Sequence, residues 1–204
     1  MSWRLLLWSV LMGLSAPILI YPVNLSLEPY FVWSSDIFPN LPIFGVLFYS
    51  WTACLLVLIF TAGDGQRAQW ERLALVVLAA LIFRGFWVFF SAIQHQGLLH
   101  LNETQWWLNT GKIVSPGFYG DWPGLSTATA LIVRVTGLEL YPAATLFTLV
   151  MTLSIAIGGY ALLQGALKSS RDASLACLLV LAGDQWLHIL YWPWTMSLGL
   201  ALLF

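Results

Sequence analysis

Residues 140–167 read LYPAATLFTLVMTLSIAIGGYALLQGAL and contain no charged side chain. An α-helix needs about 20 mainly apolar residues to cross a hydrocarbon core of about 30 Å. This stretch is longer than that, and residues 5–27 and 37–63 also contain no charged side chain. The pattern predicts helices that span a membrane.

The composition of the whole chain favours the same interpretation. Of its 204 residues, eight are Lys or Arg and nine are Asp or Glu, so that 8% are charged, against roughly 25% in soluble domains. Hydrophobic residues make up 60%, and the mean hydropathy is +0.83. We therefore expect a multi-pass integral membrane protein in contact with lipids. A net charge of −1 excludes the broad basic surface that nucleic-acid binding requires.

We expect an all-α, polytopic transmembrane helix bundle of about six spans, with residues 1–204 forming a single domain. The first five expected spans cover residues 3–21, 41–62, 73–92, 142–165 and 173–188. A sixth begins near Trp192 and is still apolar at Phe204. Because this apolar run meets the end of the sequence, we expect the chain to be the N-terminal portion of a longer protein.

The basic residues predict the orientation, because the cytoplasmic loops of membrane proteins are enriched in Lys and Arg. Five of them lie in segments that we place in the cytoplasm: Arg4, Arg67, Arg72, Lys168 and Arg171. We interpret residues 64–72 as a solvated loop. Residues 93–141 then form an extracytoplasmic loop. Within it, residues 124–138 would make a helix about 22 Å long, too short to cross, so we expect this helix to lie along the membrane surface.

The extracytoplasmic loop holds the largest group of ionisable residues in the chain. They are His95, His100, Glu103, Lys112, Asp121, Arg134 and Glu139. His100 and Glu103 are three positions apart and would share one face of a helix. Thr110-Gly111 is typical of a helix end, and Asp121 begins a typical turn. Any chemistry is therefore expected in this loop.

Two sites inside the expected spans are further candidates. Arg84 lies near the middle of the bilayer, where a charge costs about 2.5–3.5 kcal/mol on insertion scales. It either reaches a lipid phosphate at the outer face or pairs with Asp184. Asp184 and His188 are four positions apart near the outer end of the fifth expected span. They either line a polar pocket below the loop or form a water-exposed helix end.

Four motifs carry a resemblance to a known family. They are His100-Leu101-Asn102-Glu103-Thr104, Leu108-Asn109-Thr110-Gly111-Lys112-Ile113, Tyr119-Gly120-Asp121-Trp122-Pro123-Gly124 and Trp192-Pro193-Trp194-Thr195-Met196-Ser197-Leu198. The first three resemble the first large outer loop of GT-C glycosyltransferases, polytopic enzymes whose donor is a sugar linked to polyprenyl phosphate. The fourth is similar to a segment that opens a later outer-facing helix in that family. The resemblance covers about residues 95–204.

The resemblance implies that a sugar is transferred from the lipid-linked donor to an acceptor at the extracytoplasmic face of a prokaryotic cytoplasmic membrane. It implies catalytic roles for Glu103 and Asp121, as a base or a metal ligand. The residues expected to bind substrate are His100, Arg134, Arg84, Asp184 and His188. A divalent metal ion, with unassigned ligands, is an alternative source of positive charge for the donor phosphate.

One position departs from the family pattern. The acidic residue of the family falls at Gln96, an amide that cannot act as a base. Either Glu103 or another carboxylate replaces that residue, or the chain is an inactive relative. The rival from a different functional class is a non-catalytic scaffold or transport subunit, which predicts polar residues along a path through the bilayer.

Overall fold

The computed structural model describes residues 3–25, 41–90, 95–112 and 124–182, and all of the regular structure in these ranges is α-helical. The helices are α1 (Trp3–Leu25), α2 (Leu41–Thr61), α3 (Gln66–Phe90), α4 (His95–Thr110), α5 (Gly124–Thr136), α6 (Leu140–Leu167) and α7 (Ser170–Ala182). The prediction of an all-α fold is confirmed for these residues. The remainder of the fifth expected span and the whole of the sixth lie outside the described part.

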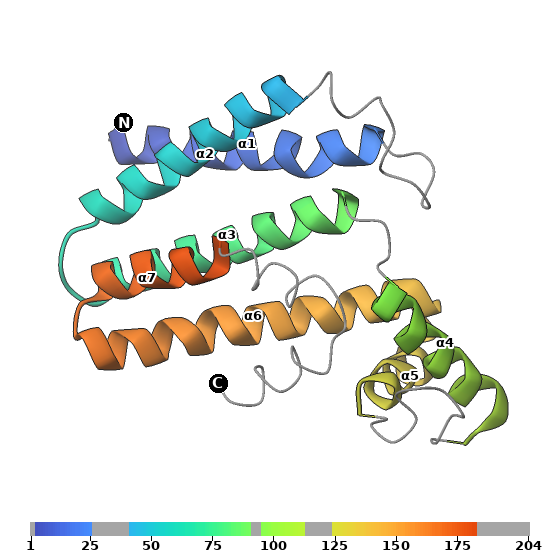
Figure 1. Cartoon of the computed structure of the whole chain (residues 1–204). Coiled ribbons are helices and arrows are strands. Elements are labelled where there is room, and N and C mark those ends of the chain that lie inside the picture. Colours follow the sequence, from blue (N-terminus) through green and yellow to red (C-terminus); the bar gives the residue numbers. More distant parts are fainter. Residues whose placement is uncertain (1–2, 26–40, 91–94, 113–123, 183–204) are drawn as a thin grey trace.

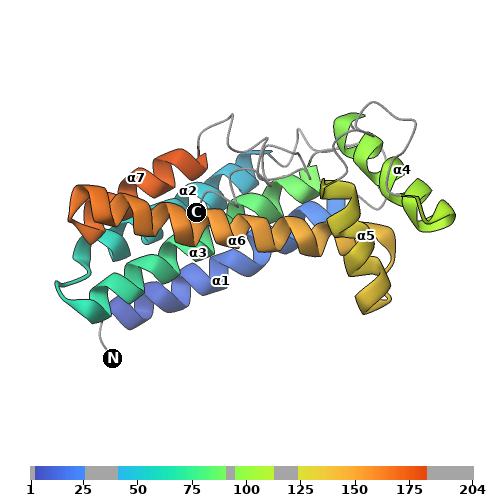
Figure 2. The same cartoon turned by 90° about the horizontal axis from the view of Figure 1, so that it is seen from below.

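Five of the helices, α1, α2, α3, α6 and α7, run side by side in alternating directions, whereas α4 and α5 lie beyond the end of this bundle where α6 begins (Figure 1). The view from below shows the same separation (Figure 2). Helix α3 packs on α1, α6 and α7, while α5 packs on both α4 and α6. The bundle therefore has two distinct ends, and one of them carries the α4–α5 pair.

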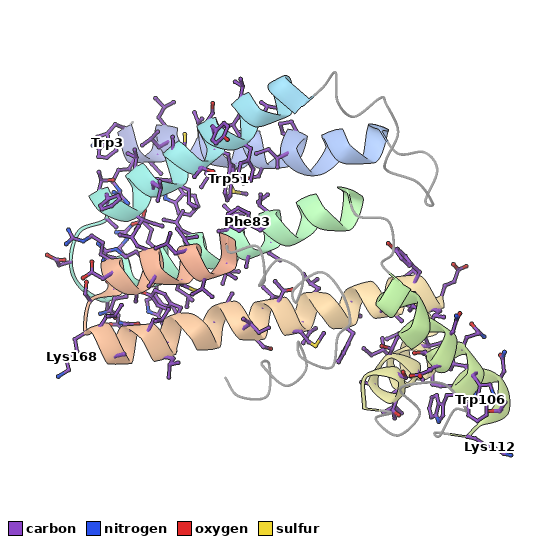
Figure 3. The ribbon with its side chains drawn as sticks, viewed as in Figure 1. Trp3, Trp51, Phe83, Trp106, Lys112 and Lys168 are labelled. Carbon is purple, nitrogen blue, oxygen red and sulfur yellow. The ribbon has the colours of Figure 1, made fainter. Side chains whose placement is uncertain are left out.

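The core of the bundle is built from aliphatic side chains, with aromatic rings between α2 and α3. The rings of Trp51 and Phe83 meet edge to face with their centroids 6.0 Å apart (Figure 3). The indole Nε1 of Trp51 donates a hydrogen bond to Ser15 Oγ at 3.0 Å, and Ser15 Oγ in turn donates to the carbonyl of Leu11 at 2.8 Å. Each buried polar group here has a partner, as the apolar surroundings require.

Helix α3 begins seven residues earlier than expected, so the prediction of a solvated loop over residues 64–72 is wrong for most of that segment. The turn after α2 is short, and Gly65 takes a φ of +101°, a conformation that glycine adopts without strain. Arg72, expected in the loop, is only 3% exposed. Glu71 forms an ion pair with Arg4 of α1 and accepts a hydrogen bond from Trp8 Nε1 at 2.9 Å. Glu71 and Arg72 therefore find partners on other parts of the bundle, and their charges do not require the solvent exposure of a loop.

One helix of the described part, α6, is long and apolar enough to cross a membrane by its length and composition. The described apolar portions of α1 and α2 are shorter, Trp3–Ile18 and Gly45–Thr61. A six-span bundle was expected, and among the described residues a single helix meets the criteria for a span.

Candidate functional site

The candidate site lies on α4 and α5, the two helices that the sequence predicts within residues 93–141. Helix α4 ends at Thr110, and Gly111 follows with a φ of +69°. The Gly111 N–H donates to the carbonyl of Trp107 at 2.8 Å. The helix end predicted from Thr110-Gly111 is therefore confirmed, with glycine in the left-handed conformation that such ends favour.

The face between α4 and α5 is polar and buried. Ser126 Oγ of α5 donates a hydrogen bond to Glu103 Oε2 of α4 at 3.3 Å, and Glu103 is only 8% exposed. Thr104 and Thr129 are also buried. The small hydroxyl side chains allow the two helices to approach closely, and Ser126 supplies a hydrogen bond to the buried carboxyl group. Sequence reasoning selected Glu103 but missed its hydroxyl neighbours.

Arg134 makes a second link between the two helices. It lies in the last turn of α5, and its Nη2 donates to the carbonyl of Leu108 in the last turn of α4 at 3.0 Å. The last carbonyls of a helix have no partner within it and carry partial negative charge, so a guanidinium group binds them favourably. Leu108 is five residues beyond Glu103, which is roughly 7.5 Å along the helix axis. The contact thus holds a guanidinium group at a backbone carbonyl about one and a half helical turns beyond Glu103.

Trp107 carries an unsatisfied donor on the same helix face. Its indole Nε1 is buried and has no hydrogen-bond partner among the residues that the structure describes. Trp107 is four positions after Glu103, the spacing that places two side chains on one face of a helix. A buried donor without a partner costs about 1–3 kcal/mol, so this atom would gain by meeting an acceptor oxygen. Trp107 was not among the site residues predicted from the sequence.

The remaining predicted site residues fall wholly or partly outside the described residues. His100 lies in α4 and Arg84 in α3, but only their helical backbone is described. Asp121, Asp184 and His188 belong to segments that are not described at all. The expected pairing of Arg84 with Asp184, and the expected pocket at the end of α7, remain predictions.

Comparison of the chain with protein-family models, curated proteins and solved structures finds no match. The candidate site therefore rests on its own geometry.

A metal site is not apparent in the described residues. Within residues 3–25, 41–90, 95–112 and 124–182, no group of three or more His, Cys, Asp or Glu side chains is arranged to hold a metal ion. Because the His100 and Asp121 side chains lie outside that search, the metal ligand role suggested for Glu103 stays a prediction.

The opposite end of the bundle collects the basic residues. The start of α1, the start of α3 and the α6–α7 turn meet there, bringing together Arg4, Arg67, Arg72, Lys168 and Arg171. In Figure 3, Trp3 and Lys168 mark this end, whereas Trp106 and Lys112 mark the α4 end. These five basic residues and the charged residues of α4 and α5 thus lie at opposite ends of one bundle. We call the end with the five basic residues the basic end.

Proposed function

We propose that the chain is a multi-pass membrane protein of about six spans in a prokaryotic cytoplasmic membrane. The support comes from apolar side chains that point away from the bundle on four helices. They include Leu6 and Met12 of α1, Val46 and Phe60 of α2, Val150, Ile157 and Leu162 of α6, and Leu179 of α7. A water-soluble bundle would carry polar residues on these outer faces, and lipid is the environment that such faces suit.

The proposed orientation places the basic end in the cytoplasm and α4–α5 outside. The enrichment of cytoplasmic loops in Lys and Arg supports this choice. Helix α5 fits the outer surface, because its hydroxyl face is buried on α4 while Leu131 and Val135 are exposed. At a membrane surface this apolar face would enter the lipid.

The activity that we propose for this outer face is transfer of a sugar from a polyprenyl-phosphate donor. The observation that carries the proposal is the buried carboxylate of Glu103 on the α4–α5 face. In the transfer step, the acceptor hydroxyl oxygen bonds to the anomeric carbon as the bond from that carbon to the phosphate oxygen breaks. The hydroxyl proton passes to Glu103, and polyprenyl phosphate leaves.

Each neighbouring group has a part in this proposal. The base must be within hydrogen-bond reach of the acceptor hydroxyl, and Asp121 is the second candidate for that task. The leaving phosphate gains negative charge and needs a nearby cation, which Arg134 supplies, and His100 is proposed as a further substrate-binding residue. Arg84, Asp184 and His188 are proposed to bind the donor from the side of the membrane.

The test is an assay of polyprenyl phosphate release by the protein in proteoliposomes, with a panel of polyprenyl-phosphate sugars as donors. Glu103→Gln keeps the shape of the side chain and its ability to accept from Ser126 but removes the base, so activity should fall at least about a hundredfold. Glu139→Gln is the matched control, because Glu139 is exposed and makes no side-chain cap of α6. Equal activity in the two variants would contradict the proposal.

A non-catalytic role is the second candidate, as a scaffold or transport subunit or an inactive relative of the family. The favouring observation is that the Glu103 carboxylate already accepts a hydrogen bond from α5. Under this alternative, no donor in the panel yields polyprenyl phosphate with the unaltered chain, and Glu103→Gln changes only stability.

A further inference from the structure

A polar pocket at the basic end lies apart from the candidate site on α4 and α5. Its volume is about 510 Å³, and its walls come from the end of α2, the first turns of α3 and the α6–α7 turn. Three cationic side chains, Arg72, Lys168 and Arg171, line it together with a single carboxylate, Asp64. The lining therefore has an excess of positive charge.

The innermost cation is Arg72, whose guanidinium is held by neutral acceptors. It donates to the carbonyl of Ile59 at 3.4 Å, the carbonyl of Ala62 at 2.7 Å and Ser170 Oγ at 2.6 Å. Buried charges in proteins are usually paired with an opposite charge. Among the described residues, the ion pairs that form are Arg4 with Glu71 and Arg171 with Asp172. The charge of Arg72 is thus fixed in place at the wall of the pocket, and the acceptors that hold it there carry no formal charge.

Hydroxyl and backbone groups add donors beside this cation. Ser169 and Ser170 line the pocket, and Ser170 Oγ accepts from Arg72 at its wall. Helix α7 begins at Ser170, and the positive end of its dipole at this pocket is partly offset by Asp172 of its first turn, which pairs with Arg171. Lys168 and Arg171 line the pocket and are exposed. Their long side chains can therefore change conformation when a ligand binds.

We propose that this pocket binds a phosphate group. Guanidinium, ammonium and hydroxyl donors around one cavity are the set that recognises phosphate oxygens. The group is carried by a lipid headgroup from the adjacent leaflet or is a free phosphate ion, and both present anionic phosphate oxygens. The site is separate from the proposed sugar transfer and stands whether or not that activity is found.

The experiment uses the purified full chain in detergent. Binding of inorganic phosphate is measured by thermal shift against sodium chloride of equal ionic strength, since a ligand that binds the folded state raises its unfolding temperature. Binding of phosphatidylglycerol is measured by native mass spectrometry against phosphatidylcholine. A response to phosphate ions assigns the site to a free ion, and a response to phosphatidylglycerol alone assigns it to a headgroup.

The variant is Lys168→Asn with Arg171→Gln, which removes two exposed charges of the pocket and leaves the buried Arg72 in place. Asparagine tolerates the left-handed conformation of Lys168, whose φ is +53°. Affinity for the responding probe should fall about tenfold. The control, Arg67→Gln with Lys112→Gln, removes two exposed charges outside the pocket and should bind as the unaltered chain does. No response to either probe, or equal loss in variant and control, would overturn the proposal.

Discussion

Ser126 Oγ donates a hydrogen bond to Glu103 Oε2 at 3.3 Å, which joins α5 to α4 through two buried side chains. The bond ties the proposed base to a helix that follows it by more than 20 residues in the sequence. A carboxylate fixed in this way has a defined position without any ligand. The same contact gives Glu103 a structural role that mutants can separate from chemistry.

Replacing Ser126 by alanine should loosen the α4–α5 pair. A hydrogen bond to a charged group contributes about 1.5 kcal/mol or more, so amide hydrogens in both helices should exchange at least about tenfold faster with deuterium. The control is Ser9→Ala, because Ser9 is exposed and donates only to the carbonyl of Leu5 in its own helix. Unchanged exchange in α4 would show that the bond does not hold the pair together.

Arg72→Lys should destabilise the bundle although it keeps the charge. The planar guanidinium of Arg72 donates three hydrogen bonds that join α3 to the end of α2 and to α7, and a lysine ammonium cannot reproduce this geometry. We expect a loss of about 2 kcal/mol in the free energy of unfolding. Thermal unfolding in detergent, with Arg67→Lys as a control at an exposed position, measures this difference. Equal unfolding temperatures for the two variants would mean that these three bonds contribute little.

Ser15→Ala should leave the buried indole N–H of Trp51 without its acceptor. Hydrogen bonds between helices in membrane proteins contribute about 0.6 kcal/mol on average, and the unsatisfied donor raises the expected loss to about 1 kcal/mol. Ser154→Ala is the matched control, because Ser154 donates only to Val150 of its own helix. A loss no greater than that of the control would place the Trp51 N–H in contact with another acceptor.

The helices themselves were largely predictable, because apolar runs and a few end signals define them locally. Thr110-Gly111 marked the end of α4 correctly. The start of α3 was missed because the prediction treated charged residues as boundaries of spans. Arg67, Glu71 and Arg72 are compatible with helix, and Glu71 and Arg72 find partners on other elements.

The details of the candidate site could not be read from local patterns. Glu103 was selected as an ionisable residue in the outer loop, but its burial depends on the docking of α5. Ser126 was not among the site residues predicted from the sequence. The pairing of these two residues requires the three-dimensional arrangement, as does the position of Arg134 at the carbonyl of Leu108.

The central claim is that the α4–α5 pair and the basic end lie on opposite sides of a membrane. Single cysteines at Lys112→Cys and Lys168→Cys, in a background with Cys54→Ala and Cys177→Ala, test it with a maleimide that cannot cross membranes. We predict that Lys112→Cys is labelled in intact cells and that Lys168→Cys is labelled only after the membrane is permeabilised. Labelling of Lys168→Cys in intact cells, or protection of Lys112→Cys until permeabilisation, would contradict the account.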